Sequence, residues 1–266
     1  MCRLLGVVSR HKAVLTELLA QDLGSFVELS SIHCDGWGVA AWDGDDSLVV
    51  DKQPGAARLE PRMTAVTDTL TSDAALLHLR KASVGMRVTA NNTHPFVVGN
   101  VAFAHNGYFG PADEVDQALS DLRAPTPEGE TDSERYFALV TALMSQEGPV
   151  DAILRAAETI TAAAAEVVSL NAMMLTHDAL YAYCQYAPGA ASANLESGGS
   201  SYDLRFRTES DRVVVASTGW GETDRTWEIL PQHSVLEMRR SDLAVTVHRP
   251  RSGHRATGQA GRRVGG

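Results

Sequence analysis

The chain opens with Met1-Cys2-Arg3-Leu4-Leu5-Gly6-Val7-Val8-Ser9, and the apolar run after the cysteine predicts a strand over Leu4–Ser9. Aminopeptidases remove Met before a small residue, so we expect the mature protein to begin at Cys2. An N-terminal cysteine carries a thiol nucleophile and a free α-amine together, and an α-amine with a pKa of about 7.7–8.0 can take the thiol proton. Cysteine at position 2 also occurs by chance, so the rest of the chain must decide.

The composition is that of an ordinary globular protein with an acidic body. Of the 266 residues, 44% are hydrophobic and 21% are charged, and the net charge is −10. Three widely spaced cysteines form no C-x-x-C pair, which favours neither a disulfide framework nor a zinc site and suits a reducing cytoplasm. No apolar run of about 20 residues predicts a membrane span. We therefore expect a cytoplasmic protein that binds no metal, cofactor, membrane or nucleic acid.

The last part of the chain differs in composition from the rest. Residues 249–266 contain five arginines and no acidic residue, together with several glycines. A basic stretch of this kind can bind nucleic acid or anionic lipid, but its composition favours a disordered, solvated terminus. We find no internal repeat and no linker that forces a boundary, so the sequence predicts one domain over residues 2–248 and a basic tail.

Strands and helices are predicted in blocks along this domain. Short strands alternate with turn signals in the first hundred residues, helical periodicity dominates the middle, and strands return after residue 170. The predicted strands are Leu4–Ser9, Gly38–Trp42, Leu48–Lys52, Ala74–Leu79, a hairpin over Phe96–Ala104, Asn171–Leu175, Leu180–Gln185, Arg212–Ala216, Ser234–Met238 and Ala244–His248. The predicted helices are Ala13–Leu23, Arg62–Leu70, Asp132–Met144 and Val150–Val168. This order predicts an α+β fold in which two sheets carry helices on their outer faces.

Three polar segments lie beside predicted strands. Asp35-Gly36-Trp37-Gly38 precedes one strand and is typical of a tight turn closed by an aromatic side chain. His78-Leu79-Arg80-Lys81-Ala82-Ser83 places Arg80 at the end of another strand. An arginine there is either a surface charge or, facing a pocket, a planar donor that grips a carboxylate. Asn91-Asn92-Thr93-His94-Pro95-Phe96 is a polar turn that enters the hairpin.

Two later segments each allow two interpretations. In Ala104-His105-Asn106-Gly107, Asn-Gly is the commonest hairpin-turn pair. The same pair can form an oxyanion hole from the Asn106 amide and the Gly107 N–H, where one donor is typically worth about 2.7–4 kcal/mol. Gly129-Glu130-Thr131-Asp132-Ser133-Glu134 opens a predicted helix. Either Thr131 or Asp132 caps that helix, with acids in its first turn, or Asp132 is free to bind an ammonium group.

Each segment is weak evidence alone, but their order with Cys2 resembles the glutaminase domain of class II glutamine amidotransferases. These enzymes are N-terminal-nucleophile hydrolases. The resemblance is closest to the small stand-alone members, including the γ-glutamyl hydrolase of ergothioneine biosynthesis. It covers about residues 2–248 and is most specific over residues 2–135. It implies a four-layer αββα sandwich, in agreement with the order of strands and helices.

The resemblance also implies a role for six residues. Cys2 would attack the γ-carbonyl of glutamine or of another γ-glutamyl amide, with its own α-amine as base and then acid. Water would release glutamate from the resulting thioester. The residues that would assist are Asn106 and Gly107 for the oxyanion, Arg80 for the α-carboxylate with Ser83 nearby, and Asp132 for the α-ammonium.

Two positions depart from the better-known members of the family. Lys81 and Val84 stand where those members often have Trp and His, which questions the lid over the glutamine pocket and its coupling to a synthase. No synthase domain follows in the 266 residues, so the sequence favours a stand-alone hydrolase of a small γ-glutamyl molecule. The alternatives are a glutaminase subunit that passes ammonia to a separate synthase partner, and a silent binding module. A homodimer through sheet edges is compatible with the sequence, and the leaving group is not readable from it.

Overall fold

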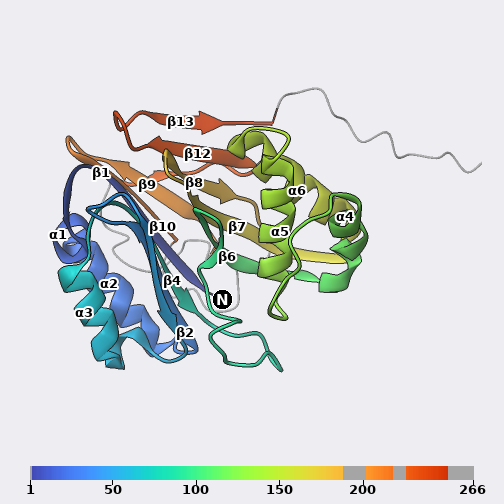
Figure 1. The fold of residues 1–266 in the computed structure, drawn as a ribbon, viewed down its shortest axis with the longest axis horizontal. Helices are drawn as coiled ribbons and strands as arrows, with labels where there is room; N and C mark the ends of the chain where they lie inside the picture. The colour runs from blue at the N-terminus through green and yellow to red at the C-terminus, as the bar shows by residue number, and fades with distance from the viewer. Residues whose placement is uncertain (1, 188–201, 218–225, 251–266) are drawn as a thin grey trace, which may run out of the picture.

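The protein folds into two antiparallel sheets that pack face to face between two layers of helices (Figure 1). A computed structural model describes residues 2–187, 202–217 and 226–250. Within these residues the layers follow the order helix, sheet, sheet, helix, which is the αββα sandwich that the sequence predicts. The Gly-, Ser- and Ala-rich stretch 187–201, whose composition is typical of a loop, and the predicted tail at 249–266 lie almost entirely outside the described residues.

The first sheet has β1 near its middle. The strand order is β11-β9-β10-β1-β4-β2-β3, and every neighbouring pair is antiparallel. The bounds of these strands are β1 Arg3–Val14, β2 Gly36–Trp42, β3 Leu48–Gln53, β4 Thr71–Arg80, β9 Leu204–Thr208, β10 Arg212–Ser217 and β11 Glu228–Ile229. The start of β1 therefore lies between the end of β4 and the end of β10, where Arg3 pairs with Leu79.

The second sheet lies across from the first. Its strand order is β13-β12-β8-β7-β6-β5, again with antiparallel neighbours. The bounds of these strands are β5 Phe96–Val98, β6 Val101–Gly110, β7 Glu166–Leu175, β8 Ala179–Cys184, β12 Ser234–Arg239 and β13 Val245–His248. Strands β1 and β4 contact β6 across the space between the sheets.

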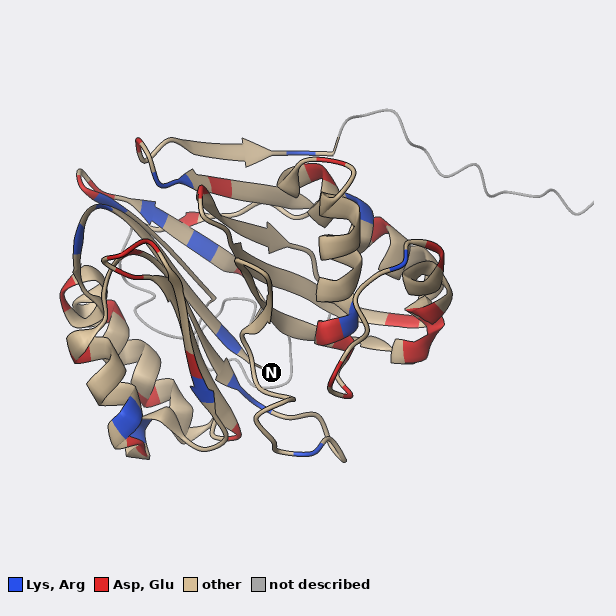
Figure 2. Ribbon diagram, in the orientation of Figure 1, with Lys and Arg blue, Asp and Glu red and all other residues tan. Residues whose placement is uncertain are grey.

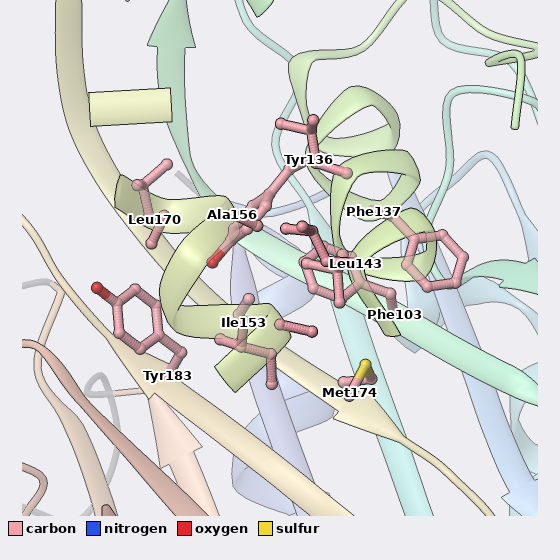
Figure 3. Close-up of a cluster of buried hydrophobic side chains, with 14 of the residues drawn as sticks. Phe103, Tyr136, Phe137, Leu143, Ile153, Ala156, Leu170, Met174 and Tyr183 are labelled. Carbon is pink, nitrogen blue, oxygen red and sulfur yellow. The ribbon is translucent and has the colours of Figure 1, made fainter. Parts of the chain in front are cut away.

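Each sheet carries its own helices on its outer face (Figure 1). The helices on the first sheet are α1 Leu15–Leu19, α2 Gln21–Glu28 and α3 Pro61–Thr69, and those on the second are α4 Asp116–Asp121, α5 Asp132–Met144 and α6 Pro149–Ala163. Three clusters of buried apolar side chains fill the layers between. In the cluster under α5 and α6, Phe103, Phe137 and Ile153 pack with Tyr183 between helix and sheet (Figure 3).

The residues of β1 alternate between two of these cores. Leu4 and Val8 belong to the core between the sheets, whereas Leu5 and Val7 face the helices α1 to α3. Because side chains on a strand alternate between its faces, the same pleat directs residue 2 toward the space between the sheets. The nucleophile predicted from the sequence thus faces β6 of the opposite sheet.

Several predicted boundaries are wrong, and each error has a local cause. The helix predicted over Ala13–Leu23 begins at Leu15 because β1 continues to Val14, and it breaks at Ala20, whose φ is 44°. The helix predicted to Val168 ends at Ala163, and the β-branched pair after it enters β7 to complete the sheet beside β6. Strand β9 is missing from the prediction altogether. The helix predicted over Asp132–Met144 is confirmed, since Thr131 caps it as expected.

Three further observations concern the helices, the possible metal ligands and the charges of the described chain. No helix among these residues is both long and apolar enough to cross a bilayer. Nor do three or more His, Cys, Asp or Glu side chains gather there in a way that could hold a metal ion. Figure 2 shows basic positions on the strands beside the N-terminus and acidic positions at the start of α5.

Candidate active site

Cys2 lies just before β1 with its sulfur against the backbone of Lys81. The Lys81 N–H donates to Sγ at 3.4 Å, and Sγ is 3.7 Å from the Lys81 carbonyl oxygen. Only 8% of Cys2 is exposed, and burial raises the pKa of its thiol. The Lys81 N–H and the charge of Arg80 act in the opposite direction, while Asp132 raises the pKa further. Cys2, Arg80 and Asp132 are therefore close enough to interact electrostatically.

Arg80 ends β4 as a buried guanidinium with an unused donor. It is 3% exposed, its Nη2 donates to the Arg87 carbonyl at 3.1 Å, and its buried Nη1 has no hydrogen-bond partner. No carboxylate forms an ion pair with it in the part of the chain that the structure describes. Burial lowers the pKa of Arg80, and Cys2 and Asp35 counteract this effect. A buried cation without an anionic partner is costly, so this arrangement suits an anionic ligand.

The Asp35-Gly36-Trp37-Gly38 segment positions the backbone beside Cys2. The Asp35 N–H donates to the Arg80 carbonyl at 3.0 Å, and its Oδ2 accepts from the Ala82 N–H at 2.9 Å. These two bonds fix the residue between them, Lys81, whose N–H meets the sulfur. Gly38 lets the polar turn that contains His94 approach closely, because a Cβ at residue 38 would lie 2.1 Å from the His94 carbonyl oxygen. The glycines belong to strand β2, so the predicted tight turn is wrong.

Asn106 and Gly107 lie inside strand β6, opposite Asn171 and Leu170 of β7. The hairpin-turn interpretation of this Asn-Gly pair is therefore wrong. Asn106 is fully buried, and neither its amide nitrogen nor its amide oxygen has a hydrogen-bond partner. Glycine is needed at 107 for a steric reason, since a Cβ would lie 1.9 Å from the Ser169 carbonyl oxygen. An unpaired, fully buried amide is rare and suits a ligand that completes its hydrogen bonds.

Asp132 begins α5 with both carboxylate oxygens held by backbone N–H groups. Oδ1 accepts from the Ser133 N–H at 2.8 Å, and Oδ2 accepts from the Phe109 N–H of β6 at 3.0 Å. The helix itself is capped by Thr131, whose Oγ1 accepts from the Glu134 N–H at 3.1 Å. Because Thr131 caps the helix, the Asp132 carboxylate is partly exposed and keeps lone pairs for a cation.

Ser83, the sixth predicted site residue, follows Arg80 by three positions. It lies in the exposed loop after Arg80, where its carbonyl oxygen accepts from the Met86 N–H at 3.0 Å. Its hydroxyl makes no hydrogen bond within the described residues. The other five lie on four elements. Cys2 and Arg80 lie at the adjacent ends of β1 and β4, Asn106 and Gly107 lie on β6, and Asp132 lies on α5, which is bonded to β6.

Sequence reasoning missed a backbone donor and a polar layer behind Asn106. The Lys81 N–H at Cys2 carries no sequence signal, because every residue but proline has the group. The layer behind Asn106 consists of Ser169 and Asn171, and the Ser169 hydroxyl donates to the Asn106 carbonyl at 3.0 Å. Two polar residues alternating with apolar ones at the start of a buried strand could have pointed to this layer.

The fold and the position of Cys2 define a class of protein. Two antiparallel sheets between helical layers, with a cysteine at the start of a central strand, are the architecture of N-terminal-nucleophile hydrolases. A family model described as "Glutamine amidotransferases class-II" matches residues 1–261. The chain therefore belongs to the class II glutamine amidotransferases, a family of enzymes.

Relatives and solved structures agree with this assignment. The chain is 27% identical over 257 residues to the gamma-glutamyl-hercynylcysteine sulfoxide hydrolase of Mycobacterium tuberculosis (strain CDC 1551 / Oshkosh), a match that covers 93% of this chain and 97% of that protein. A glutamine aminotransferase class-II domain protein from Silicibacter pomeroyi superimposes with a TM-score of 0.67 at 19% identity, over 93% and 99% of the two chains. Glutamine phosphoribosylpyrophosphate amidotransferase from B. subtilis gives 0.62 at 18% identity, over 93% of this chain and 49% of that one. Both structures support the fold.

Proposed function

We propose that this protein is an N-terminal cysteine amidohydrolase that cleaves the γ-glutamyl amide bond of glutamine or of a small γ-glutamyl metabolite. The observation that carries the proposal is the buried, unpaired Nη1 of Arg80 beside Cys2, with the carboxylate of Asp132 in electrostatic range of the same sulfur. A cation and an anion that both act on the nucleophile match a ligand that carries both charges.

The two charges explain why the bond cleaved would be a γ-amide. Arg80 binds the α-carboxylate of the glutamyl group, and Asp132 binds its α-ammonium. A residue within a peptide chain has neither free group, so it cannot satisfy Arg80 or Asp132. Two anchored groups also fix the γ-carbonyl relative to Cys2, and such positioning is a large part of catalysis.

Cys2 needs a base, because burial raises the pKa of its thiol. Removal of Met1 gives Cys2 a free α-amine next to that thiol. The amine takes the thiol proton as sulfur attacks the γ-carbonyl carbon, and the Lys81 N–H stabilises the developing thiolate. The Asn106 side-chain amide and the Gly107 N–H stabilise the oxyanion of the tetrahedral intermediate.

Collapse of the intermediate breaks the C–N bond, and the α-ammonium of Cys2 returns its proton to the departing amine. The glutamyl group remains on sulfur as a thioester. A water molecule, deprotonated by the same α-amine, then attacks the thioester carbonyl. The C–S bond breaks, the thiol is regenerated, and glutamate leaves. The buried amide of Asn106 can donate to the oxyanion in both steps.

The curated relative favours a metabolite hydrolase over a subunit that delivers ammonia. The mycobacterial protein is named a hydrolase of a γ-glutamyl compound, and the match covers 97% of its length. The present chain thus matches nearly the whole of a relative that bears a hydrolase name. The amine released by this chain is then expected to be a small molecule and not only ammonia.

The proposal is tested by glutamate release from glutamine and from a panel of γ-glutamyl amides. Intact mass must first show that Met1 is absent. We expect release by the native protein, none by Cys2→Ala, and normal release by Cys34→Ala, which removes a half-buried thiol that lies 3.7 Å from Asp35 Oδ1 and has no part in the proposed chemistry. Release by Cys2→Ala, or none by native protein with a free Cys2, would refute the proposal. In the second case, co-purification with an ATP-using synthase would indicate a glutaminase subunit.

A further inference from the structure

His105 connects the strand of Asn106 to the carboxylate of Asp132. It immediately precedes Asn106 on β6 and is buried. Its Nε2 lies 2.9 Å from the Ser169 carbonyl oxygen, and its Nδ1 lies 2.9 Å from the Ser133 hydroxyl. The Ser133 hydroxyl in turn lies 3.3 Å from Oδ1 of Asp132. The Ser133 hydroxyl thus lies within hydrogen-bond distance of both the imidazole and the carboxylate.

The direction of these hydrogen bonds follows from what each atom can donate. A carbonyl oxygen only accepts, so Nε2 of His105 carries a proton. A neutral imidazole has a single N–H, so its Nδ1 accepts. The Ser133 hydroxyl has one proton and must give it to Nδ1. It therefore has none left for Oδ1 of Asp132.

The surroundings of His105 favour this neutral form. Burial lowers the pKa of His105, and the charge of Asp132 on α5 partly counteracts this. Three other titratable groups of the described chain lie near the ring: Tyr136 of α5, His78 of β4 and His94. Burial raises the pKa of Tyr136 and lowers that of both histidines, to about 3 for His78, so all three are neutral near pH 7. Asp132 is then the charged group that faces His105.

We propose that His105 and Ser133 are positioning residues for Asp132, and that the neutral Nε2–H tautomer of His105 keeps a lone pair of Asp132 Oδ1 free for the ammonium group of a substrate. This inference rests on the proposed function, which assigns the α-ammonium to Asp132. When His105 gains a proton, its Nδ1–H donates to the Ser133 oxygen. The Ser133 hydroxyl then turns to Asp132 Oδ1, and the site binds an ammonium less well.

The relay is tested by ligand affinity, which does not depend on turnover. Free glutamate carries both α groups, and its ammonium stays charged between about pH 5 and pH 7. For the native protein we expect the Kd of glutamate to rise as acidification protonates His105, by about tenfold once the imidazole is charged, since the Ser133 hydroxyl then donates to Asp132 Oδ1 in competition with the ammonium. Ser133→Ala lacks the relay proton, so its rise should stay below about threefold, whereas Ser133→Thr should behave as native.

The tautomer gives a second readout that activity cannot influence. In protein with ¹⁵N-labelled histidine, long-range ¹H–¹⁵N correlations should show His105 as the Nε2–H tautomer at neutral pH. An Nδ1–H tautomer, a charged imidazole, or equal acid dependence in Ser133→Ala and native protein would overturn the inference. So would absence of glutamate binding. Absence of glutamate release with the expected tautomer and affinities would instead refute only the hydrolase function.

Discussion

An arginine lies at each end of strand β4, Arg80 within the strand and Arg240 after β12, and the two differ in what they contact. Arg80 ends the strand with an unpaired Nη1 and no carboxylate partner among the described residues. Near its start, Asp73 accepts from Arg240 at 2.8 Å, and Arg240 also donates to Asp46 at 3.1 Å and to the His177 carbonyl. The Arg240 guanidinium lies over the Trp42 ring, 5.4 Å from its centroid. Arg240 ties the two sheets together, whereas Arg80 keeps a donor for the α-carboxylate that we propose it binds.

The largest effect that tests this contrast is on catalysis by Arg80→Gln. We expect kcat/KM for glutamate release to fall about 10³-fold, because a buried charge-assisted contact to a carboxylate is lost. Most of the loss should lie in KM, since the α-carboxylate is held equally in ground and transition states. The free energy of unfolding should not decrease by more than about 1 kcal/mol, because within the described residues the Arg80 side chain makes a single hydrogen bond, to the Arg87 carbonyl. A large loss of stability without loss of activity would show that Arg80 is structural.

Asn106 and its cross-strand neighbour Asn171 offer the same contrast with amides. The Asn106 amide is unpaired, whereas the Asn171 amide accepts from the Gln185 N–H at 2.9 Å and donates to the Tyr202 carbonyl. Asn106→Ala should lower kcat by about 10²–10³ with little change in KM, as expected for loss of an oxyanion donor. Asn171→Ala should instead lower the free energy of unfolding by about 1–3 kcal/mol. Steady-state kinetics and urea denaturation of both variants measure these effects. Equal losses of kcat and of unfolding free energy in the two variants would contradict a catalytic role for Asn106 alone.

The fold and one helix could be predicted from the sequence, but the surroundings of Asn106 and Arg80 could not. The order of motifs indicated the fold, and Thr131 with the amphipathic pattern after it correctly predicted α5. The sequence could not show that Asn106-Gly107 lies within a strand, because its fit depends on Ser169, more than sixty residues away. Nor could it show which arginine lacks a partner, since that depends on contacts between distant strands. Local chemistry predicted the candidate residues, and only tertiary contacts separate ligand-binding from structural ones.

A third prediction concerns the satisfied arginine. Arg240→Met keeps an apolar stem beside Trp42 but leaves Asp73 without its cation. We expect the free energy of unfolding to fall by about 2–3 kcal/mol, at the lower end for a buried ion pair because Asp46 is half exposed. Glutamate release per folded molecule should be unchanged. Urea denaturation and kinetics on the same preparation give both values, and impaired catalysis in the folded variant would mean that the two ends of β4 are coupled.

The smallest effect is expected for His177, an exposed residue that shares Asp46 with Arg240. Its Nε2 lies 2.6 Å from Asp46 and its Nδ1 lies 2.9 Å from Asp178, and these carboxylates raise the pKa of the imidazole. A raised pKa in the folded state means that folding favours the protonated form. The resulting stability is fully present below the ordinary imidazole pKa of about 6.5 and is lost as pH rises through the higher, folded value.

His177→Gln should therefore lower Tm slightly at mildly acidic pH and leave it unchanged at alkaline pH. The effect should be small because the side chain is more than half exposed and solvent screens both pairs. Thermal melts of native and variant protein over a pH series measure it, and added salt should reduce the acid difference. An equal Tm difference at every pH would mean that His177 acts by packing against Trp42, whose ring it contacts edge-on at 5.1 Å. In that case the ion pairs of Arg240, and not those of His177, would hold this end of the sheets together.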